Sequence, residues 1–386
     1  MKFFKSSIFI LTFLFSNNLC FAESVSIPEN LSIPKPSLQH LQELTDDTGI
    51  FEFASYDIAD KKHAYCTEDN ARALVAALMF NRKYPSDKTA VKLAKTYMSY
   101  LLYALDDKEG NFRHRLDFQR NSHDWVTEDA YGRAIWGLGY ALAYPINDSM
   151  GKLAKKMFKK TFFRSKDLIW PRAKTYTILG LHYYLQAHAS SDNSASSIKP
   201  SIKDVKKRLI YLSDSLINLY KKNSSEDWQW FEKTMTYDNA KMPLALFLAY
   251  EHTKNKKYLD IAGKTLDFLI EANFQGGKMM RVIGNNGWYS KGKKPAVYDQ
   301  QPIDAAAMVE ACAQAYIITG RKEYKEKMIQ AFQWFLGNNI TGKPIYDFTN
   351  GGSKDGIAKI GVNENEGAES SIEVLISLLT LKETLK

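Results

Sequence analysis

Two kinds of helical segment alternate along the chain. One kind is rich in Ala, Leu and aromatic residues on almost every face, and the other is amphipathic and rich in Lys. A helix that is apolar all round is buried, whereas a helix with one charged face is peripheral. The first kind covers residues 68–84, 128–144, 171–189, 237–252, 300–318 and 367–382; the second covers 37–47, 88–105, 148–162, 202–222, 256–272 and 322–337.

Six buried and six peripheral helices in strict alternation predict an all-α fold, an (α/α)6 toroid of six inner and six outer helices. The first outer helix is then expected beside the last inner helix. Long irregular loops, including the strand-tolerant stretches 51–53, 112–116 and 279–283, lead into inner helices. Weak repetition supports a reused hairpin, because Thr67-Glu68-Asp69 recurs as Thr127-Glu128-Asp129. All inner N-termini should therefore open on one face.

The first 22 residues have the pattern of a secretory signal peptide. Lys2 and Lys5 precede an apolar run that is shorter than the ~20 residues needed to span a bilayer, and no later stretch approaches that length. We therefore expect a signal peptide over 1–22, one toroid domain over 23–386, and an exported protein in the periplasm or outside the cell. No membrane span is expected after removal of the signal.

Composition and motifs narrow the chemistry. The chain has 386 residues, of which 25% are charged and 45% hydrophobic, so a largely disordered protein is excluded. Beyond the signal only Cys66 and Cys312 remain, and each fits a small buried hydrophobe better than a disulfide. No zinc or nucleotide-binding motif is present, so no metal or other cofactor is expected. The net charge of +9 is spread over many helices without a nucleic-acid motif, so no nucleic-acid partner is expected; the oligomeric state stays open.

Acidic residues gather at the starts of the inner helices, where the toroid would bring them to one end of a central funnel. We predict Asp69, Asp129 and Asp238 as reacting carboxylates, with Glu68, Glu128 and Glu232 as close rivals. The structural alternative is that these acids cap the helices and offset the positive end of the helix dipole. Aromatic and amide groups are interleaved with them, which is what the ring faces and hydroxyls of a sugar need.

The same loops supply candidate substrate-binding residues. They are His63, Tyr65, Arg72, His123, Arg133, Arg172, Trp230, Tyr237, Asn239, Trp288, Asp299, Gln300, Gln301, Asn363, Glu366 and Glu369. Trp125, Trp170 and Trp228 are further candidates for stacking platforms. We also expect the motif Asn363 to Ser370 to fold over the funnel mouth, with Glu369 pairing with Arg72 or Arg133 where the first and last hairpins meet.

Several motifs together resemble a bacterial family of the six-hairpin glycosidase superfamily. They are 63–73 (HAYCTEDNARA), 127–134 (TEDAYGRA), 171–173 (PRA), 230–239 (WFEKTMTYDN), 299–302 (DQQP) and 363–370 (NENEGAES). Members are often encoded beside, or fused behind, glycosyltransferase domains. The resemblance covers nearly all of the mature chain and implies a toroid that acts on glycans. Since this chain has an export signal and no glycosyltransferase half, we expect it to process a glycan outside the cytoplasm.

The expected activity is hydrolysis of a glycosidic bond in an oligo- or polysaccharide by two carboxyl groups, one protonated and one ionised, with inversion as our prediction. One alternative is β-elimination on a uronate polymer, because Arg113, His114 and Arg115 could neutralise a uronate. A 2-epimerase is a weaker alternative, since it would need two facing histidines. A glycan-binding module without catalysis is the remaining alternative.

Overall fold

The computed structural model describes residues 33–122, 125–189 and 200–386, and residues 34–386 form one compact unit. The expected signal peptide (1–22) and His123 lie outside the described residues. The inner helices are α2 (Thr67–Lys83), α4 (Glu128–Ala143), α6 (Pro171–Ala187), α8 (Lys241–Thr253), α10 (Pro302–Thr319) and α12 (Ala368–Thr384). The outer helices are α1 (Gln39–Glu43), α3 (Lys88–Ala104), α5 (Asp148–Thr161), α7 (Ile202–Asn223), α9 (Lys256–Phe274) and α11 (Lys322–Gln333), with a short 3₁₀ helix η1 (Phe162–Lys166) after α5.

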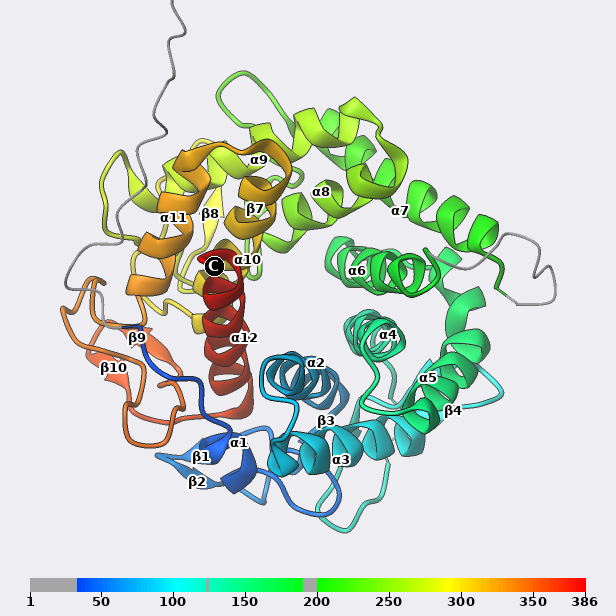
Figure 1. The fold of residues 1–386 in the computed structure, drawn as a ribbon. Coiled ribbons are helices and arrows are strands. Elements are labelled where there is room, and N and C mark those ends of the chain that lie inside the picture. The colour runs from blue at the N-terminus through cyan, green and yellow to red at the C-terminus, as the bar shows by residue number, and fades with distance from the viewer. Residues whose placement is uncertain (1–32, 123–124, 190–199) are drawn as a thin grey trace, which may run out of the picture. The chain divides into compact units, whose positions relative to one another are not determined.

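These helices form a closed ring, so the predicted (α/α)6 toroid is confirmed (Figure 1). Each inner helix packs against the next one, and α12 returns to pack against α2. Helix α1 contacts α12, as expected for the first outer helix, although it is only one turn long instead of the predicted 37–47. The alternation of wholly apolar and amphipathic segments therefore specified the order of layers.

The inner helices α4 and α6 approach one another through glycines. A Cβ atom on Gly139 would lie 2.2 Å from the carbonyl oxygen of Gly180, and one on Gly180 would lie 2.3 Å from that of Ile135. No side chain fits between the two backbones at this point, so glycine is required for close packing rather than for its flexibility.

The starts of α8 and α10 differ from the prediction. Helix α8 begins at Lys241 rather than 237, because Asp238 has a φ of 54° and so cannot continue a right-handed helix. Helix α10 begins at Pro302, which suits the first helical position because proline has no N–H to leave unpaired there. Asp238, Asn239, Gln300 and Gln301 therefore lie in the loops before their helices.

Five short antiparallel strand pairs lie in the loops of the described residues. The pairs are β1 (Ala54–Ser55) with β2 (Ile58–Ala59), β3 (Tyr65–Cys66) with β6 (Arg115–Leu116), β4 (Leu105–Asp106) with β5 (Asn111–Phe112), β7 (Thr234–Met235) with β8 (Tyr289–Ser290), and β9 (Gly356–Ala358) with β10 (Gly361–Asn363). The strand-tolerant stretch 112–116 contributes to two of these pairs, whereas 279–283 forms no strand. The pairing of β3 with β6 fixes the start of α2 beside His114 and Arg115.

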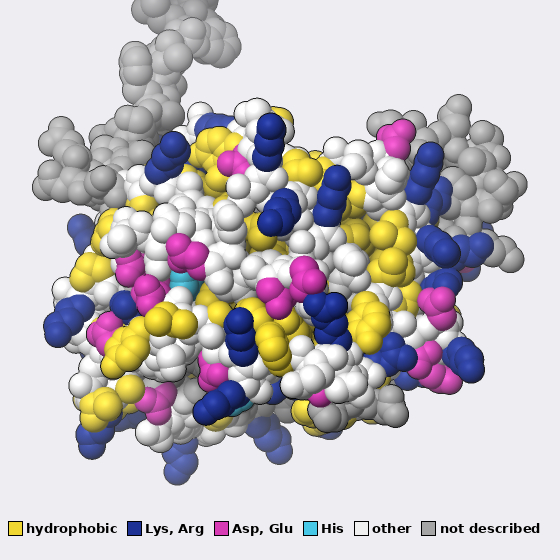
Figure 2. Space-filling view, turned by 90° about the horizontal axis from the view of Figure 1, so that it is seen from below, with side chains coloured by type: hydrophobic (Ala, Val, Ile, Leu, Met, Phe, Trp, Pro, Cys, Tyr) yellow, Lys and Arg dark blue, Asp and Glu magenta, His cyan; other side chains and the backbone are white. Residues whose placement is uncertain are grey.

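The surface charges and the two cysteines can be compared with the expectations from the sequence. Figure 2 shows Lys and Arg side chains spread over one face of the molecule and interspersed with acidic and hydrophobic ones. Cys66 and Cys312 are both free and buried. Among the described residues, none of the helices combines the length and the apolar character that crossing a bilayer requires.

Candidate active site

A cavity of about 660 Å³ lies at the N-terminal ends of the inner helices. Among the described residues its wall carries seven carboxyl groups, which belong to Glu52, Glu68, Asp69, Asp129, Asp299, Asp355 and Glu369. The guanidinium groups in the wall belong to Arg72, Arg115 and Arg133. Three of the acids (Glu68, Asp69 and Asp129) lie in the first turns of α2 and α4, so the shared direction of the inner helices brings them to one end of the ring.

Arg72 joins the two ends of the chain in this wall. Its guanidinium lies 2.8 Å from Glu369 Oε2 on α12 and 2.9 Å from Asp69 Oδ1, and its Nε lies 3.5 Å from Glu373 Oε1. The predicted contact between Glu369 and Arg72 is thus confirmed. Burial raises the pKa of Asp69 to about 6 although Arg72 opposes the shift, and it raises the pKa of Glu373 to about 8.

Asp129 is held ionised from two sides. The Tyr237 hydroxyl donates to Asp129 Oδ2 over 2.7 Å, and Arg133 Nη1 lies 3.3 Å from the same oxygen. Burial alone would raise the pKa of Asp129, but the charge of Arg133 and the hydrogen bond from Tyr237 hold the pKa below its ordinary value. Arg133 is itself fixed, since its guanidinium lies over the Tyr176 ring at 4.4 Å. The Asp129 side chain stays 28% exposed, so a ligand can reach it.

The pKa of Glu52 is shifted in the opposite direction from that of Asp129. Its Oε1 accepts from Arg115 Nη2 over 2.5 Å, whereas its buried Oε2 has no hydrogen-bond partner within the described part of the chain. Burial is the main cause that raises the pKa of Glu52 to about 8, and the negative charge of Asp69 is the second. Glu52 therefore keeps its proton at neutral pH while Asp129 has lost its own.

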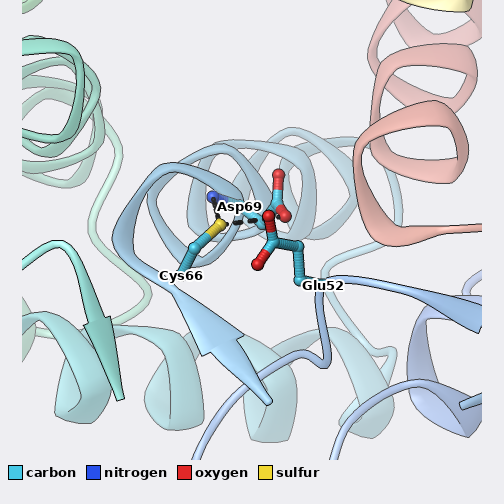
Figure 3. Close-up of side chains that lie close together, drawn as sticks. All are labelled: Glu52, Cys66 and Asp69. Carbon is cyan, nitrogen blue, oxygen red and sulfur yellow. Dashed lines mark hydrogen bonds between the residues drawn. The ribbon is translucent and has the colours of Figure 1, made fainter. Parts of the chain in front are cut away.

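Glu52, Cys66 and Asp69 point toward one another at the start of α2 (Figure 3). One ligand-type atom from each residue lies within 4.8 Å of the others, and the Cys66 thiol donates to Asp69 Oδ2 over 3.0 Å. A metal would need these groups deprotonated. In the metal-free protein, burial raises the pKa of the Cys66 thiol, as it does for both carboxyl groups.

His114 forms a neutral part of the wall. Arg115 Nε donates to His114 Nε2 over 3.2 Å, so this nitrogen acts as an acceptor, and burial lowers the pKa of His114 to about 4. The imidazole stacks on the Trp125 ring with centroids 4.4 Å apart. Trp125 is 59% exposed, so the wall residue His114 carries an exposed aromatic ring stacked on it.

Many of the predicted site residues line this cavity. They are Glu68, Asp69, Arg72, Asp129, Arg133, Tyr237, Asp299, Gln300, Gln301, Asn363 and Glu369. The Gln300 amide is committed within the protein, because its Oε1 accepts from the Trp334 indole and its Nε2 donates to the Val297 carbonyl. The structure thus gathers residues from α2, α4, α12 and the loops before α8 and α10.

Other predicted residues have partners away from the cavity. Glu128 accepts from the backbone N–H groups of Ile169 and Trp170 at 2.8 Å, so it holds the segment that leads into α6. Asp238 is fully buried and accepts from the Tyr176 hydroxyl over 2.5 Å. Both acids therefore support neighbouring elements rather than facing the cavity.

A second group holds the loops together. Arg172 donates to Glu232 over 2.8 Å, to Asn239 over 3.2 Å and to the Tyr237 carbonyl over 2.6 Å, so it fixes the loop that carries Tyr237. The remaining predicted residues that the structure describes also lie outside the cavity wall. Tyr65 donates to Asp46, and Glu366 accepts from Lys354 and Asn350. Trp230 is buried in the core, whereas His63 is exposed beside Asp60. Trp288 lies in the loop before α10.

The prediction missed several residues of the wall. Glu52, Asn285 and Asp355 were not singled out, and His114 and Arg115 were considered only for β-elimination. Glu52 stands between two phenylalanines in an irregular stretch. A single acid between two aromatic residues is the feature of the sequence that could have indicated a buried carboxyl group. Asp355 accepts from Gly367 N and from Ser370 Oγ, and its pKa is raised to about 6 by burial. It lies just before β9 and is held against the start of α12 by these two hydrogen bonds.

Comparison with known proteins confirms the fold. The family described as D-glucuronyl C5-epimerase C-terminus matches residues 217–298, and the sequence matches no curated protein. The cellobiose 2-epimerase from Bacillus thermoamylovorans B4167 superposes with a TM-score of 0.62 at 13% identity, over 88% of this chain and 96% of that one. A GH76 α-mannanase from Bacteroides thetaiotaomicron gives 0.59 at 13% identity, over 89% and 93%.

A polysaccharide lyase gives a TM-score of 0.62 at 10% identity, covering 89% of this chain and 52% of that one. Likeness at this level of identity shows the fold. The chain thus shares the fold of these proteins, and its own helices form the (α/α)6 toroid that their alternation predicted.

Proposed function

We propose that the protein is a carbohydrate-active enzyme that hydrolyses a glycosidic bond in the cavity at the inner-helix N-termini. One observation carries the proposal: in the same cavity the pKa of Glu52 is raised to about 8 and that of Asp129 lies below its ordinary value. A pair of carboxyl groups whose environments separate their pKa values supplies both the acid and the base for glycoside hydrolysis.

In this mechanism Glu52 gives its proton to the glycosidic oxygen as the bond from that oxygen to the anomeric carbon breaks. Asp129 takes a proton from a water molecule as the water oxygen attacks the anomeric carbon, which gives the predicted inversion. Tyr237 and Arg133 orient Asp129 and keep it ionised. Asp69 lies close enough to Glu52 for its charge to help retain the Glu52 proton.

The composition of the wall favours a neutral glycan. Among the described residues, carboxyl groups outnumber guanidinium groups in the wall by seven to three. Even with Glu52 protonated this excess disfavours a uronate, so β-elimination on an acidic polymer is less well supported than hydrolysis. The carboxyl groups of the wall and the amides of Asn285 and Asn363 can form hydrogen bonds with sugar hydroxyls. The exposed ring of Trp125 can pack on the apolar face of a pyranose. A GH76 α-mannanase with the same fold supports a glycan substrate.

Epimerisation is a second candidate, favoured by the C5-epimerase match and by the neutral imidazole of His114. An epimerase would exchange a carbon-bound proton of the sugar with solvent without cleaving the chain. His114 is the one histidine of the described wall, whereas the expected two-histidine arrangement needs a partner. The predicted signal peptide over 1–22 would place either activity outside the cytoplasm.

The test is to incubate the purified mature protein with a panel of neutral and acidic glycans and to identify products by mass spectrometry. New reducing ends from a neutral glycan, lost in Glu52→Gln and Asp129→Asn, support the proposal. Glu226→Gln is the matched control, since Glu226 is an exposed acid away from the cavity. An unsaturated product, or full activity in both cavity variants, would overturn it.

A further inference from the structure

A second cavity, of about 420 Å³, lies at the C-terminal ends of the inner helices. Every inner helix contributes to its wall, with Arg82 from α2, Tyr140 from α4, Tyr183 from α6, Glu251 from α8, Gln314 from α10 and Thr384 from α12. The active-site cavity is lined by residues at the opposite ends of α2, α4 and α12 and by the loops before α8 and α10. The two cavities are therefore separate openings at the two ends of the ring.

The second cavity has a rigid aromatic side. The Tyr140 and Tyr183 rings meet edge to face with centroids 4.7 Å apart, and Tyr144 meets Tyr183 in the same way at 6.2 Å. Arg82 fixes this group, because it donates to the Tyr140 hydroxyl over 2.9 Å and its guanidinium lies 3.9 Å from the Tyr144 ring centroid. Pre-ordered aromatic rings bind a ligand at little cost in conformational entropy.

One buried donor in this wall has no partner. The indole of Trp136 is 2% exposed, and its N–H makes no hydrogen bond to any residue that the structure describes. A buried N–H without an acceptor is unfavourable, and native proteins pair most such groups. An oxygen atom of a bound ligand would pair this one.

An acceptor is available in the same wall. Glu251 Oε1 accepts from Gln314 Nε2 over 2.7 Å, which orients the carboxylate, and the side chain remains 33% exposed. The other charges are already paired, since Arg82 Nη2 lies 3.1 Å from Glu383 and Lys241 Nζ lies 2.5 Å from Glu310. The cavity thus offers an aromatic surface, the unpaired Trp136 indole and the oriented Glu251 carboxylate, with little demand for a charged ligand.

We propose that this second cavity is a binding site for a neutral saccharide of one or two rings. The aromatic side would pack on the apolar face of a pyranose, the Trp136 indole would donate to a ring or hydroxyl oxygen, and Glu251 would accept from a hydroxyl. A cavity of this size lies within the range of small-molecule sites. The proposal does not depend on the activity proposed for the first cavity.

The indole ¹⁵N–¹H resonances of the seven tryptophans report on this site directly. Glucose, mannose, maltose, cellobiose and 6α-mannobiose are titrated into the full-length Asp129→Asn protein, and Trp136→Phe assigns the resonance. We expect a saturable shift of the Trp136 signal with at least one sugar. Glu251→Gln should weaken that binding about tenfold through loss of a charged acceptor, whereas Asn363→Ala in the first cavity should leave it unchanged.

Two results would overturn the proposal. One is no shift of the Trp136 resonance with any of these sugars up to the solubility limit. The other is a shift that disappears in Asn363→Ala, because the response would then come from the first cavity. Unchanged indole resonances of the other tryptophans show that each variant is folded, and Gln314→Leu, which removes the amide that orients Glu251, provides a second variant with the same expected loss.

Discussion

The Arg72 guanidinium on α2 lies 2.8 Å from the Glu369 carboxylate on α12, so the first and last inner helices are joined by an ion pair. The same guanidinium contacts Asp69 and Glu373 and is itself 2% exposed. Ring closure and the shape of the active-site wall therefore depend on one buried cation. Removal of this cation would leave three carboxyl groups without their shared partner.

Arg72→Met should lower the free energy of unfolding by about 3–5 kcal/mol, the usual cost of breaking a buried ion pair from one side. Glu369→Gln should cost clearly less, since Glu369 is 40% exposed and Arg72 keeps two other acids. Urea unfolding of the two variants measures both effects. Equal losses would show that the contact to Glu369, rather than the buried cation, dominates ring closure.

Asp238→Asn should reduce stability more than it changes kcat for a responsive substrate. Asp238 is fully buried, and its carboxylate lies 3.7 Å from Arg133 and accepts from Tyr176, so the variant removes a charge that balances buried Arg133. Asn tolerates the positive φ at this position, so the backbone should be kept. Thermal unfolding and steady-state kinetics separate the two effects. Complete loss of turnover with an unchanged melting temperature would instead restore Asp238 as a reacting carboxylate.

The raised pKa of Glu52 predicts a pH dependence of stability. Its pKa is about 8 in the folded protein against an ordinary value of 4.5, so the native state binds more protons than the unfolded state between these values. The free energy of unfolding therefore falls as pH rises through this window, by at most about 1.4 kcal/mol per pH unit for one group.

Glu52→Gln should flatten this slope and make the protein more stable than the wild type at pH 8 and above. Because other buried acids titrate in the same range, the difference between wild type and variant at each pH is the quantity to measure. Parallel curves for the two proteins would mean that Glu52 is not protonated at neutral pH. Activity of the wild type should also decline as pH rises through about 8, where the general acid loses its proton.

Gly180→Ala tests the packing of α4 against α6. The added Cβ would lie 2.3 Å from the Ile135 carbonyl oxygen, and backbone cannot yield as a flexible side chain can. We expect a loss of about 1–3 kcal/mol in the free energy of unfolding, typical of overpacking. Gly276→Ala is a poor control because of its positive φ, whereas Gly263→Ala is a suitable one, since its Cβ would meet its nearest neighbour at 3.9 Å. A stable Gly180→Ala protein would contradict the close approach of these helices.

The sequence predicted the fold well because layer order follows from which helices are apolar on all faces. It predicted the first-turn acids Asp69 and Asp129 in the cavity for the same reason, since helix direction alone brings them together. Asp238 shows where this reasoning fails. Asp238 has a left-handed backbone conformation, so α8 begins after it and its side chain is buried in the protein. The residue type alone does not indicate this conformation.

The Glu52 and Asp355 carboxyl groups show a different limit. Both groups reach the cavity from irregular loops, Asp355 from the one beside the β9–β10 hairpin. Loops of this kind have no regular spacing of residues from which the position of a side chain could be predicted. The pKa of a group also depends on burial by distant segments, so the split between Glu52 and Asp129 could not be predicted from local sequence.

The most direct test of hydrolysis is the reaction of the mature protein with its glycan in H₂¹⁸O, followed by mass spectrometry. We predict products that carry one ¹⁸O at each new reducing end, at a rate reduced about 10²–10⁴-fold in Asp129→Asn, whose base can no longer accept a proton from water. Cleaved products without ¹⁸O and lighter by one water would indicate elimination, and an uncleaved chain with altered sugar configuration would indicate epimerisation. Either of these two results would contradict the account.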